Sequence, residues 1–216
     1  MKLQREMLRL YAVTDSKWLG KQTLAQAVEQ AIQGGVTLVQ YREKHLTGAA
    51  YAKEAAEVAA VCRRHGVPFL VNDRVEEALA LGADGVHIGQ KDGNPAEIRR
   101  RLGEGKILGV TAKTVAQAQA AQAAGADYLG VGAVFPTSTK ADAIGITLEQ
   151  LREIARSVTI PVIAIGGING ENITTLKNCS LAGVAVVSGI FAQKNIPRAC
   201  EQLSALSGQI IGGENV

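Results

Sequence analysis

Aromatic side chains are scarce in this sequence: Phe, Trp and Tyr make up 4% of its 216 residues. Proteins that bind single-stranded nucleic acid stack bases on such side chains, so the scarcity argues against that class. An excess of one charge is also missing, because 23 Lys and Arg residues face 20 Asp and Glu residues, for a formal net charge of +3. Polyanion-binding proteins carry a larger, clustered basic surplus. We therefore expect no nucleic-acid partner.

Cysteine is equally sparse, and long apolar runs are absent. Cys62, Cys179 and Cys200 lie far apart and form no Cys-x-x-Cys pair, which predicts free thiols in a reducing compartment. No run approaches the ~18 apolar residues of a membrane span. Residues 1–6 lack the apolar core of a signal peptide. These absences predict a cytoplasmic protein with no membrane partner.

What the sequence does contain is typical of a globular protein, with 47% apolar and 20% charged residues. The length suits one or two domains at about 150 residues each. No linker, charge run or low-complexity stretch divides the chain. We predict a single domain over residues 1–216, with residues 208–216 as a flexible tail because that segment contains two adjacent glycines.

The chain repeats a strand-then-helix unit. Residues 82–89 resemble residues 125–132, and in both segments a Gly-Ala-Asp sequence leads into a short apolar run. Eight such runs are candidate strands, at residues 9–14, 36–41, 68–72, 85–88, 107–110, 128–131, 162–165 and 184–188. Strands alternating with helices indicate a parallel sheet covered on both faces. Eight units in this length predict a (β/α)₈ barrel, with an open doubly wound sheet as the alternative.

Helix signals fill several of the intervals between the apolar runs. Residues 50–64 place apolar side chains at spacings of three and four, which predicts an amphipathic helix. Asn94 followed by Pro95 is typical of a helix start, as is the capping-box sequence that begins at Thr147. Thr114 is a further candidate cap.

In such a barrel the active site lies where the strands end, and polar residues gather there. Strand side chains alternate, so Gln40, Arg42 and Lys44 are expected to share one face; the alternative is a solvated charge cluster. Asp73 and Asp92 follow neighbouring strands and could share one Mg²⁺. Asp73 is also a candidate helix cap, and the two roles are compatible because a carboxylate has two oxygens.

Hydroxyls and glycines follow the later strands. Thr111 comes after the fifth strand, and the sixth is followed by a cluster that comprises Thr137, Ser138, Thr139 and Lys140. The seventh and eighth strands end in Gly166-Gly167 and Val187-Ser188-Gly189, and small residues at these ends commonly bind phosphate through backbone N–H groups. His87 lies within a strand and is interpreted as a buried core histidine. Together these elements exceed the needs of one monophosphate and fit a diphosphate with Mg²⁺ plus a separate phosphate.

At this point the sequence resembles the thiamine phosphate synthase family over nearly the whole chain. The resemblance rests on the joint order of several short motifs: Tyr-Ala-Val-Thr-Asp at 11–15, Gln-Tyr-Arg-Glu-Lys at 40–44, Val-Asn-Asp-Arg at 71–74, His-Ile-Gly-Gln-Lys-Asp at 87–92, Gly-Ala-Val-Phe-Pro-Thr-Ser-Thr-Lys at 132–140, Ile-Gly-Gly-Ile at 165–168 and Val-Ser-Gly-Ile at 187–190. The family joins a hydroxymethylpyrimidine diphosphate to a thiazole phosphate and releases pyrophosphate. The resemblance therefore implies a transferase of thiamine biosynthesis whose partners are these two small molecules.

The resemblance also implies the site residues. The pyrimidine diphosphate would be held by Gln40, Tyr41, Arg42, Glu43, Lys44, Asn72, Thr111 and Lys140. The thiazole phosphate would be held by Thr137, Ser138, Thr139, Gly167, Val187 and Ser188, and one Mg²⁺ per active site by Asp73 and Asp92. The chemistry suits these roles, because Arg42, Lys44 and Lys140 with Mg²⁺ would neutralise the departing diphosphate in a dissociative reaction.

One position departs from the family pattern, since Lys113 stands where relatives often carry His, and a Lys is a poor base near neutral pH. Three alternatives stay open: a thiazole tautomerase, a Schiff-base aldolase, and a catalytically inactive barrel that senses thiamine precursors. The tautomerase would not need the diphosphate and Mg²⁺ groups, and the aldolase would need a Lys inside the barrel. The sequence leaves the oligomeric state open, with a homo-oligomer among the options.

Overall fold

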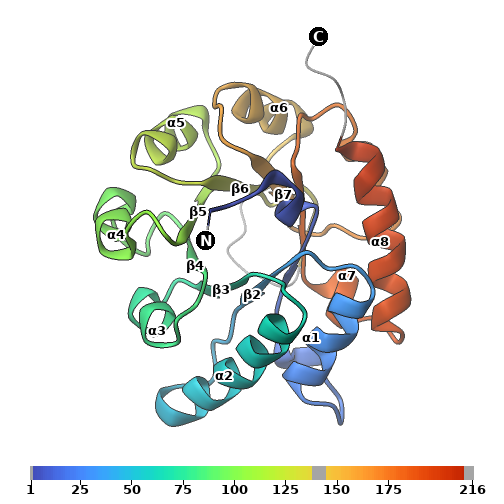
Figure 1. Cartoon of the computed structure of the whole chain (residues 1–216). Coiled ribbons are helices and arrows are strands. Elements are labelled where there is room, and N and C mark those ends of the chain that lie inside the picture. Colours follow the sequence, from blue (N-terminus) through green and yellow to red (C-terminus); the bar gives the residue numbers. More distant parts are fainter. Residues whose placement is uncertain (1, 138–144, 212–216) are drawn as a thin grey trace.

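Eight parallel strands form a closed barrel in the computed structural model, which describes residues 2–137 and 145–211 (Figure 1). The strand order around the ring follows the sequence, from β1 to β8. The strands are β1 (Leu10–Val13), β2 (Leu38–Tyr41), β3 (Phe69–Asn72), β4 (Gly85–Ile88), β5 (Ile107–Ala112), β6 (Tyr128–Gly132), β7 (Val162–Ile165) and β8 (Gly183–Val186).

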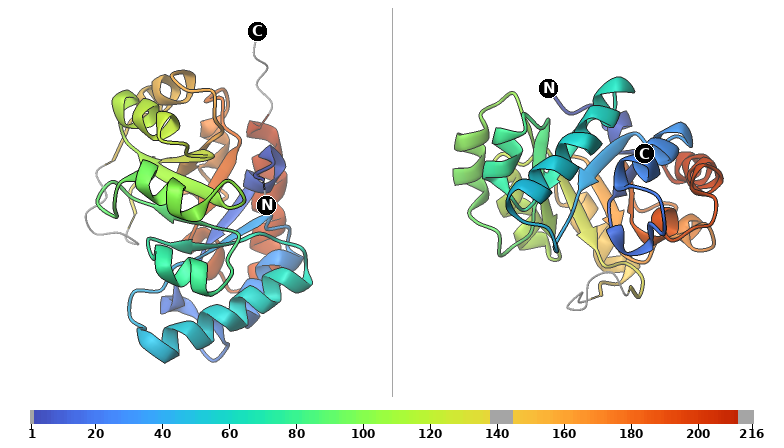
Figure 2. Two further views of the ribbon diagram at one scale, coloured as in Figure 1. Left: turned by 60° about the vertical axis from the view of Figure 1, so that its left-hand side comes forward. Right: turned by 90° about the horizontal axis from the view of Figure 1, so that it is seen from below.

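Helices surround the strands as an outer layer (Figures 1 and 2). They are α1 (Leu24–Gln33), α2 (Gly48–Arg64), α3 (Val75–Ala80), α4 (Pro95–Leu102), α5 (Val115–Ala123), α6 (Leu148–Arg156), α7 (Ser188–Phe191) and α8 (Ile196–Ile210). Three 3₁₀ helices complete the described elements, namely η1 (Arg5–Leu8), η2 (Ser16–Trp18) and η3 (Ile173–Leu176). After β7, η3 occupies the position where the repeat predicts an α-helix.

The ring closes because β1 pairs in parallel with β8, with Leu10 opposite Val184. This pairing confirms the predicted (β/α)₈ barrel and excludes the open sheet, in which the first and last strands would not meet. Alternate side chains of each strand point into the barrel or toward the helices. The interior is filled by a cluster that includes Tyr11, Leu38, Leu70, Ile107, Tyr128 and Ile163.

The Gly-Ala-Asp repeat has a structural role at the end of the barrel where the strands begin. Asp84 Oδ2 accepts a hydrogen bond from the Phe69 N–H at 2.9 Å, and Asp127 Oδ2 accepts one from the Leu108 N–H at 2.7 Å. Each carboxylate thus satisfies a backbone donor on the preceding strand. The internal similarity found in the sequence therefore marks a repeated attachment between neighbouring strands.

Most of the predicted helix starts are confirmed. The side chains of Asn94, Thr114 and Thr147 each accept a hydrogen bond from a backbone N–H in the first turn of α4, α5 and α6. The proposed cap at Asp73 is wrong, because α3 begins after Arg74 and makes no side-chain cap hydrogen bond. Asp73 instead adopts a left-handed backbone conformation with φ of 61°.

The predicted tail does not begin at Gly208, because α8 continues to Ile210 and buries that side chain. Residues 212–216 lie outside the described residues. All three cysteines are free, as predicted, and all three are buried. Burial raises the pKa of the Cys62 thiol to about 12. Among residues 2–137 and 145–211, no helix is long and apolar enough to cross a membrane.

Candidate active site

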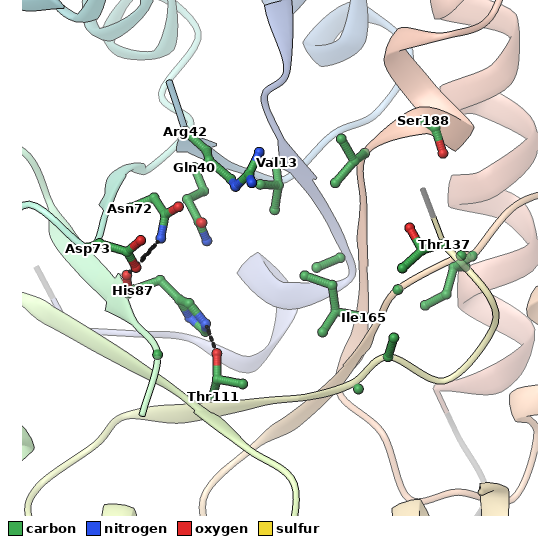
Figure 3. A pocket seen from close by; sticks show the side chains of 18 of the residues that line it. Val13, Gln40, Arg42, Asn72, Asp73, His87, Thr111, Thr137, Ile165 and Ser188 are labelled. Atoms are coloured by element: carbon green, nitrogen blue, oxygen red, sulfur yellow. Dashed lines mark hydrogen bonds between the residues drawn. The ribbon is translucent and has the colours of Figure 1, made fainter. Parts of the chain in front are cut away.

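A cavity opens at the carboxyl ends of the strands, with about 990 Å³ of space open to solvent. Figure 3 shows Arg42, Gln40, Asn72, Asp73, His87 and Thr111 grouped on one side of this cavity, while Thr137 and Ser188 lie across from them.

Three polar residues at and just after the end of β2 share the cavity, as the alternation predicts. Gln40, Arg42 and Lys44 all line it. The Thr14 hydroxyl holds the strand end in place, because it accepts a hydrogen bond from the Arg42 N–H at 2.8 Å and donates one to the Arg42 carbonyl at 3.1 Å. Arg42 Nη1 lies 4.0 Å from Asp15 Oδ2. Two cations therefore reach the mouth from one fixed strand end.

Tyr41 and Glu43, which the resemblance places with this group, are turned away from the cavity by the same alternation. The Tyr41 hydroxyl donates to Glu54 Oε2 on α2 at 3.0 Å, and its ring packs on Tyr51. The Glu43 carboxylate accepts hydrogen bonds from the Ser16 hydroxyl and the His45 N–H. Neither side chain lines the cavity. They support the strand end from behind, so any contact with substrate would come from their backbone.

Asp73 and Asp92 both line the cavity, from the ends of β3 and β4. Asn72 Nδ2 donates to Asp73 Oδ1 and lies 3.3 Å from the His87 carbonyl. Asp92 Oδ2 accepts the Gly89 N–H at 2.8 Å. Each of these bonds occupies one oxygen of its carboxylate. The described residues contain no group of three or more His, Cys, Asp or Glu arranged for a metal.

An oxygen donor set of two carboxylates suits a hard divalent cation such as Mg²⁺, which keeps waters and substrate phosphate oxygens as its other ligands. The two side chains lie beside the cationic strand end, within the same cavity. The arrangement therefore fits a cation that is shared between the protein and a diphosphate.

His87 and Thr111 form one wall of the same region. Thr111 Oγ1 lies 3.0 Å from His87 Nε2 (Figure 3), and His87 Nδ1 lies 2.9 Å from the Tyr128 hydroxyl. His87 is thus a hydrogen-bonded core histidine, as predicted, and it also lines the cavity. Lys113 lines the cavity too, so the position that departs from the family pattern lies at the mouth.

The far side of the cavity is built from small residues. Thr137, Gly167, Val187 and Ser188, which the resemblance assigns to the thiazole phosphate, all line the cavity. Gly167 has φ of 67°, and an added Cβ would lie 2.4 Å from the Pro136 carbonyl oxygen. Two backbone segments thus approach closely here. Ser138, Thr139 and Lys140, which were predicted to bind substrate, lie outside the described residues.

The sequence reasoning missed an apolar part of the wall. Val13, Ala133, Ile165, Ile168 and Ala185 also line the cavity. Strand alternation is the signal that could have found several of them.

Comparisons with known proteins agree with this geometry. A family model described as thiamine monophosphate synthase matches residues 10–190. A thiamine-phosphate synthase of Ruminiclostridium cellulolyticum is 50% identical over 194 residues, which cover 90% of this chain and 92% of the relative. One from Persephonella marina is 43% identical, over 93% of this chain and 96% of the relative. The structure of a thiamine phosphate pyrophosphorylase from Pyrococcus furiosus superposes with a TM-score of 0.88 at 35% identity, covering 96% of this chain and 99% of that one.

Proposed function

The chain belongs to the thiamine monophosphate synthase family, and we propose that the mouth of its barrel is where a pyrimidine diphosphate and a thiazole phosphate are joined. The chain is accordingly a transferase of thiamine biosynthesis. Its reaction condenses 4-amino-2-methyl-5-hydroxymethylpyrimidine diphosphate with 4-methyl-5-(2-hydroxyethyl)thiazole phosphate, giving thiamine phosphate and pyrophosphate.

One observation supports this proposal beyond family membership, namely that Arg42 and Asp73 lie on one side of a single cavity while Thr137 and Ser188 lie on the other (Figure 3). The first side contains Arg42 and Asp73, and Lys44 and Asp92 also line the cavity. On the other side, Gly167 and its neighbours offer small residues and backbone. A diphosphate with a metal fits the first side and a monophosphate fits the second. A monophosphate isomerase such as the tautomerase has no use for the first side.

We assign the pyrimidine diphosphate to the first side. Gln40, Asn72 and Thr111 supply amide and hydroxyl groups beside the two cations. Lys140 belongs to the same proposal, although it lies outside the described residues. The thiazole phosphate is assigned to the second side, with Thr137, Gly167, Val187 and Ser188. Ser138 and Thr139 belong to the same assignment. They directly follow Thr137 in the sequence and lie outside the described residues.

Asp73 and Asp92 would hold the divalent cation, which we take to be one Mg²⁺ per active site. A bound Mg²⁺ supplies charge that stabilises the leaving diphosphate. The carboxylate oxygens of these two residues are the candidate ligands; Asn72 donates a hydrogen bond to one oxygen of Asp73, and the Gly89 N–H donates to one oxygen of Asp92. Asp73 and Asp92 thus supply negative charge to the site. Without them, the positive charges of Arg42 and Lys44 would repel a metal ion.

The reaction needs positioning and charge stabilisation more than a nucleophilic side chain. The C–O bond to the diphosphate breaks with its electron pair going to the leaving group, and the electron-rich aminopyrimidine stabilises the cation at the exocyclic carbon. The lone pair of the thiazole nitrogen then forms the new C–N bond. Arg42 and Lys44 neutralise the diphosphate as it leaves. The apolar wall around Ile165 keeps water from the cation.

The same residues bear on the alternatives. None of the eight described strands contains a lysine, so the barrel interior offers no Schiff-base nucleophile for an aldolase. We also infer a single domain, since β1 closes on β8. The three buried thiols support a reducing, cytoplasmic setting.

Pyrophosphate release from the purified protein tests the function. We expect release only with both substrates and Mg²⁺, and a return to background with EDTA. Release that needs no thiazole phosphate would indicate hydrolysis instead of coupling. No release, with the fold intact by circular dichroism, would favour the tautomerase or sensor alternative, and tight binding of thiamine precursors would then distinguish the sensor.

A further inference from the structure

A chain of hydrogen bonds crosses the barrel interior directly beneath the cavity. It joins side chains from five strands. Gln40 Nε2 on β2 donates to the Tyr11 hydroxyl on β1, and the Tyr11 and Tyr128 hydroxyls lie 2.9 Å apart. The chain continues from the Tyr128 hydroxyl to His87 Nδ1 at 2.9 Å, and from His87 Nε2 to Thr111 Oγ1 at 3.0 Å. Both of its ends, Gln40 and Thr111, line the cavity.

The barrel is shaped to hold this chain. An added Cβ at Gly109 would lie 2.2 Å from Tyr128 Cζ and 2.5 Å from His87 Nδ1. An added Cβ at Gly130 would lie 2.9 Å from His87 Cε1. These two glycines face inward on β5 and β6, so they provide the space that the His87 and Tyr128 rings fill. The interior at this level therefore accommodates a polar network in place of apolar side chains.

The hydrogen bonds fix their own direction. Tyr11 accepts the amide hydrogen of Gln40, so its single hydroxyl hydrogen is directed to the Tyr128 oxygen. Tyr128 must then donate to His87 Nδ1. His87 consequently carries its proton on Nε2 and donates it to Thr111 Oγ1, so the Thr111 hydroxyl hydrogen is not used within this series of hydrogen bonds.

Burial keeps the members of the chain protonated. Tyr11 and Tyr128 are fully buried, and burial raises the pKa of both hydroxyls well above the ordinary value. The rings of Tyr11 and Tyr128 meet edge to face with centroids 6.0 Å apart. Both hydroxyls therefore remain donors at any pH at which the protein functions.

We propose that Tyr11, Tyr128 and His87 are positioning residues that set which hydrogen-bonding groups Gln40 and Thr111 present to the pyrimidine substrate. Because one hydrogen of Gln40 Nε2 is donated to Tyr11, the amide can present its Oε1 and its second N–H to the cavity. An acceptor beside a donor complements the amino group and adjacent ring nitrogen of an aminopyrimidine. Thr111 presents a hydroxyl donor, which suits an anionic oxygen. The inference rests on the proposed function for the identity of the substrate.

Removal of the hydrogen-bonding group of Tyr11, Tyr128 or His87 would allow the side chains at the ends, Gln40 and Thr111, to reorient. Without the Tyr11 hydroxyl, nothing within this chain distinguishes the two orientations of the Gln40 amide. The site would then tolerate a ring that lacks the amino group, because the flipped amide can present a donor instead of an acceptor. Sites built around hydrogen bonds to one substrate group discriminate strongly against analogues that lack it.

Binding measurements test this selection without catalysis. The probes are the pyrimidine monophosphate, its analogue without the 4-amino group, and the thiazole phosphate, each titrated calorimetrically in the absence of the second substrate. We expect the wild-type preference for the amino compound to fall about 10-fold or more in Tyr11→Phe and Tyr128→Phe, with thiazole phosphate binding unchanged. The matched control is Tyr51→Phe, which removes a hydroxyl from a buried ring outside the barrel.

An unchanged preference in both folded barrel variants would overturn the proposal, as would an equal loss in the Tyr51 control. If the wild type binds neither pyrimidine compound but the protein is folded, the substrate assignment itself is wrong, which is a different failure from an unaltered preference.

The direction of the chain has its own test. Long-range ¹H–¹⁵N spectra report which imidazole nitrogen carries the proton, and the His87 signals can be assigned by their disappearance in His87→Gln. We expect the Nε2–H form in the wild type, and a change in that signal in Tyr128→Phe. An Nδ1–H form at neutral pH would reverse the derived direction and overturn the proposal, whatever the activity of the protein.

Discussion

Asp92 Oδ2 lies 2.8 Å from the Gly89 backbone nitrogen and accepts its hydrogen, across the turn that follows β4. The contact is close, because a Cβ added at Gly89 would lie 2.8 Å from the same oxygen. Glycine at position 89 thus allows the carboxylate to fold back on its own turn. The hydrogen bond fixes one oxygen to the backbone and so restricts the orientation of the whole carboxylate.

Replacing the carboxylates of Asp92 and Asp73 by amides tests their charge while the shape of each side chain is kept. Asp92→Asn keeps an oxygen that can accept the Gly89 N–H, and Asp73→Asn keeps a residue that tolerates the left-handed backbone there. We expect turnover at low Mg²⁺ to fall on the order of 10²-fold or more in each variant, with partial recovery at high Mg²⁺. Pyrophosphate release against Mg²⁺ concentration measures it. Glu97→Gln, on the outside of α4, is the control, and an unshifted Mg²⁺ dependence in both Asp variants would refute the metal assignment.

Gly167 tests the phosphate side. Gly167→Ala places a Cβ 2.4 Å from the Pro136 carbonyl oxygen, in addition to the strain of a positive φ. We expect the KM for the thiazole phosphate to rise about 10-fold or more, because the two segments must separate. Gly82→Ala is matched for strain, with φ of 64° and nothing within 4 Å of the added Cβ. Gly82→Ala should lose about 1–2 kcal/mol of stability from the positive φ alone, and Gly167→Ala should lose more because of the added clash. An equal KM in both variants would contradict the role of Gly167.

Arg99 is expected to govern stability and leave chemistry unaltered. Its guanidinium donates to the carbonyls of Gly125, Gly103 and Lys106 and pairs with Asp127, all at the end of the barrel away from the cavity. Arg99→Met should lower the free energy of unfolding by about 2–3 kcal/mol, less than for a fully buried pair because Asp127 is partly exposed.

Urea denaturation measures that loss, and kcat of the folded enzyme should stay at the wild-type value. Arg100→Met, one residue along the same helix and mostly exposed, should change stability by less than about 0.5 kcal/mol. A fall in kcat for Arg99→Met would show that this end of the barrel communicates with the mouth.

Two glutamates behind the cationic strand end should respond to pH with opposite signs. Burial works against ionisation of Glu43, but hydrogen bonds from the His45 N–H and the Ser16 hydroxyl outweigh it and lower its pKa. Its stabilisation is therefore present above the unfolded pKa of about 4.3 and lost as pH falls through the folded value. For Glu54, burial raises the pKa despite the hydrogen bond from Tyr41, so its ionisation weakens the fold as pH rises.

Melting temperatures between pH 3 and pH 8 check this contrast. The advantage of wild type over Glu43→Gln should grow as pH rises, whereas its advantage over Glu54→Gln should shrink. Parallel pH trends in the two variants would contradict the opposite pKa shifts.

The barrel was predictable because its signals are local. Short apolar runs separated by helix starts set the strands, and Asn94 and Thr147 marked helix boundaries correctly. The Asp73 cap failed because its sequence pattern fits a cap but the chain turns through a left-handed conformation at that residue. A tail from Gly208 failed because Ile210 continues the buried face of α8.

The site was predictable in part. The alternation of side chains from β2 onward selected Gln40, Arg42 and Lys44, which line the cavity. The resemblance assigned all of residues 40–44 to the substrate and so also included Tyr41 and Glu43, whose side chains face away from the cavity. The series of hydrogen bonds from Gln40 to Thr111 was missed because its side chains come from five strands. They meet only because closure of the ring sets the register of those strands. Sequence spacing within one segment carries no information about such contacts.

Closure of the ring also has a consequence for the order of folding. Every strand from β2 to β7 pairs with neighbours that are adjacent in the sequence, whereas Leu10 and Val184 are separated by more than 170 residues. Of all the strand pairings, the pairing of β1 with β8 has the largest entropic cost of loop closure. We therefore expect it to form last. Val13 reaches the mouth from β1, and Val187 and Ser188 reach it from the end of β8. During refolding, helical content should therefore return before the protein regains the ability to bind thiazole phosphate.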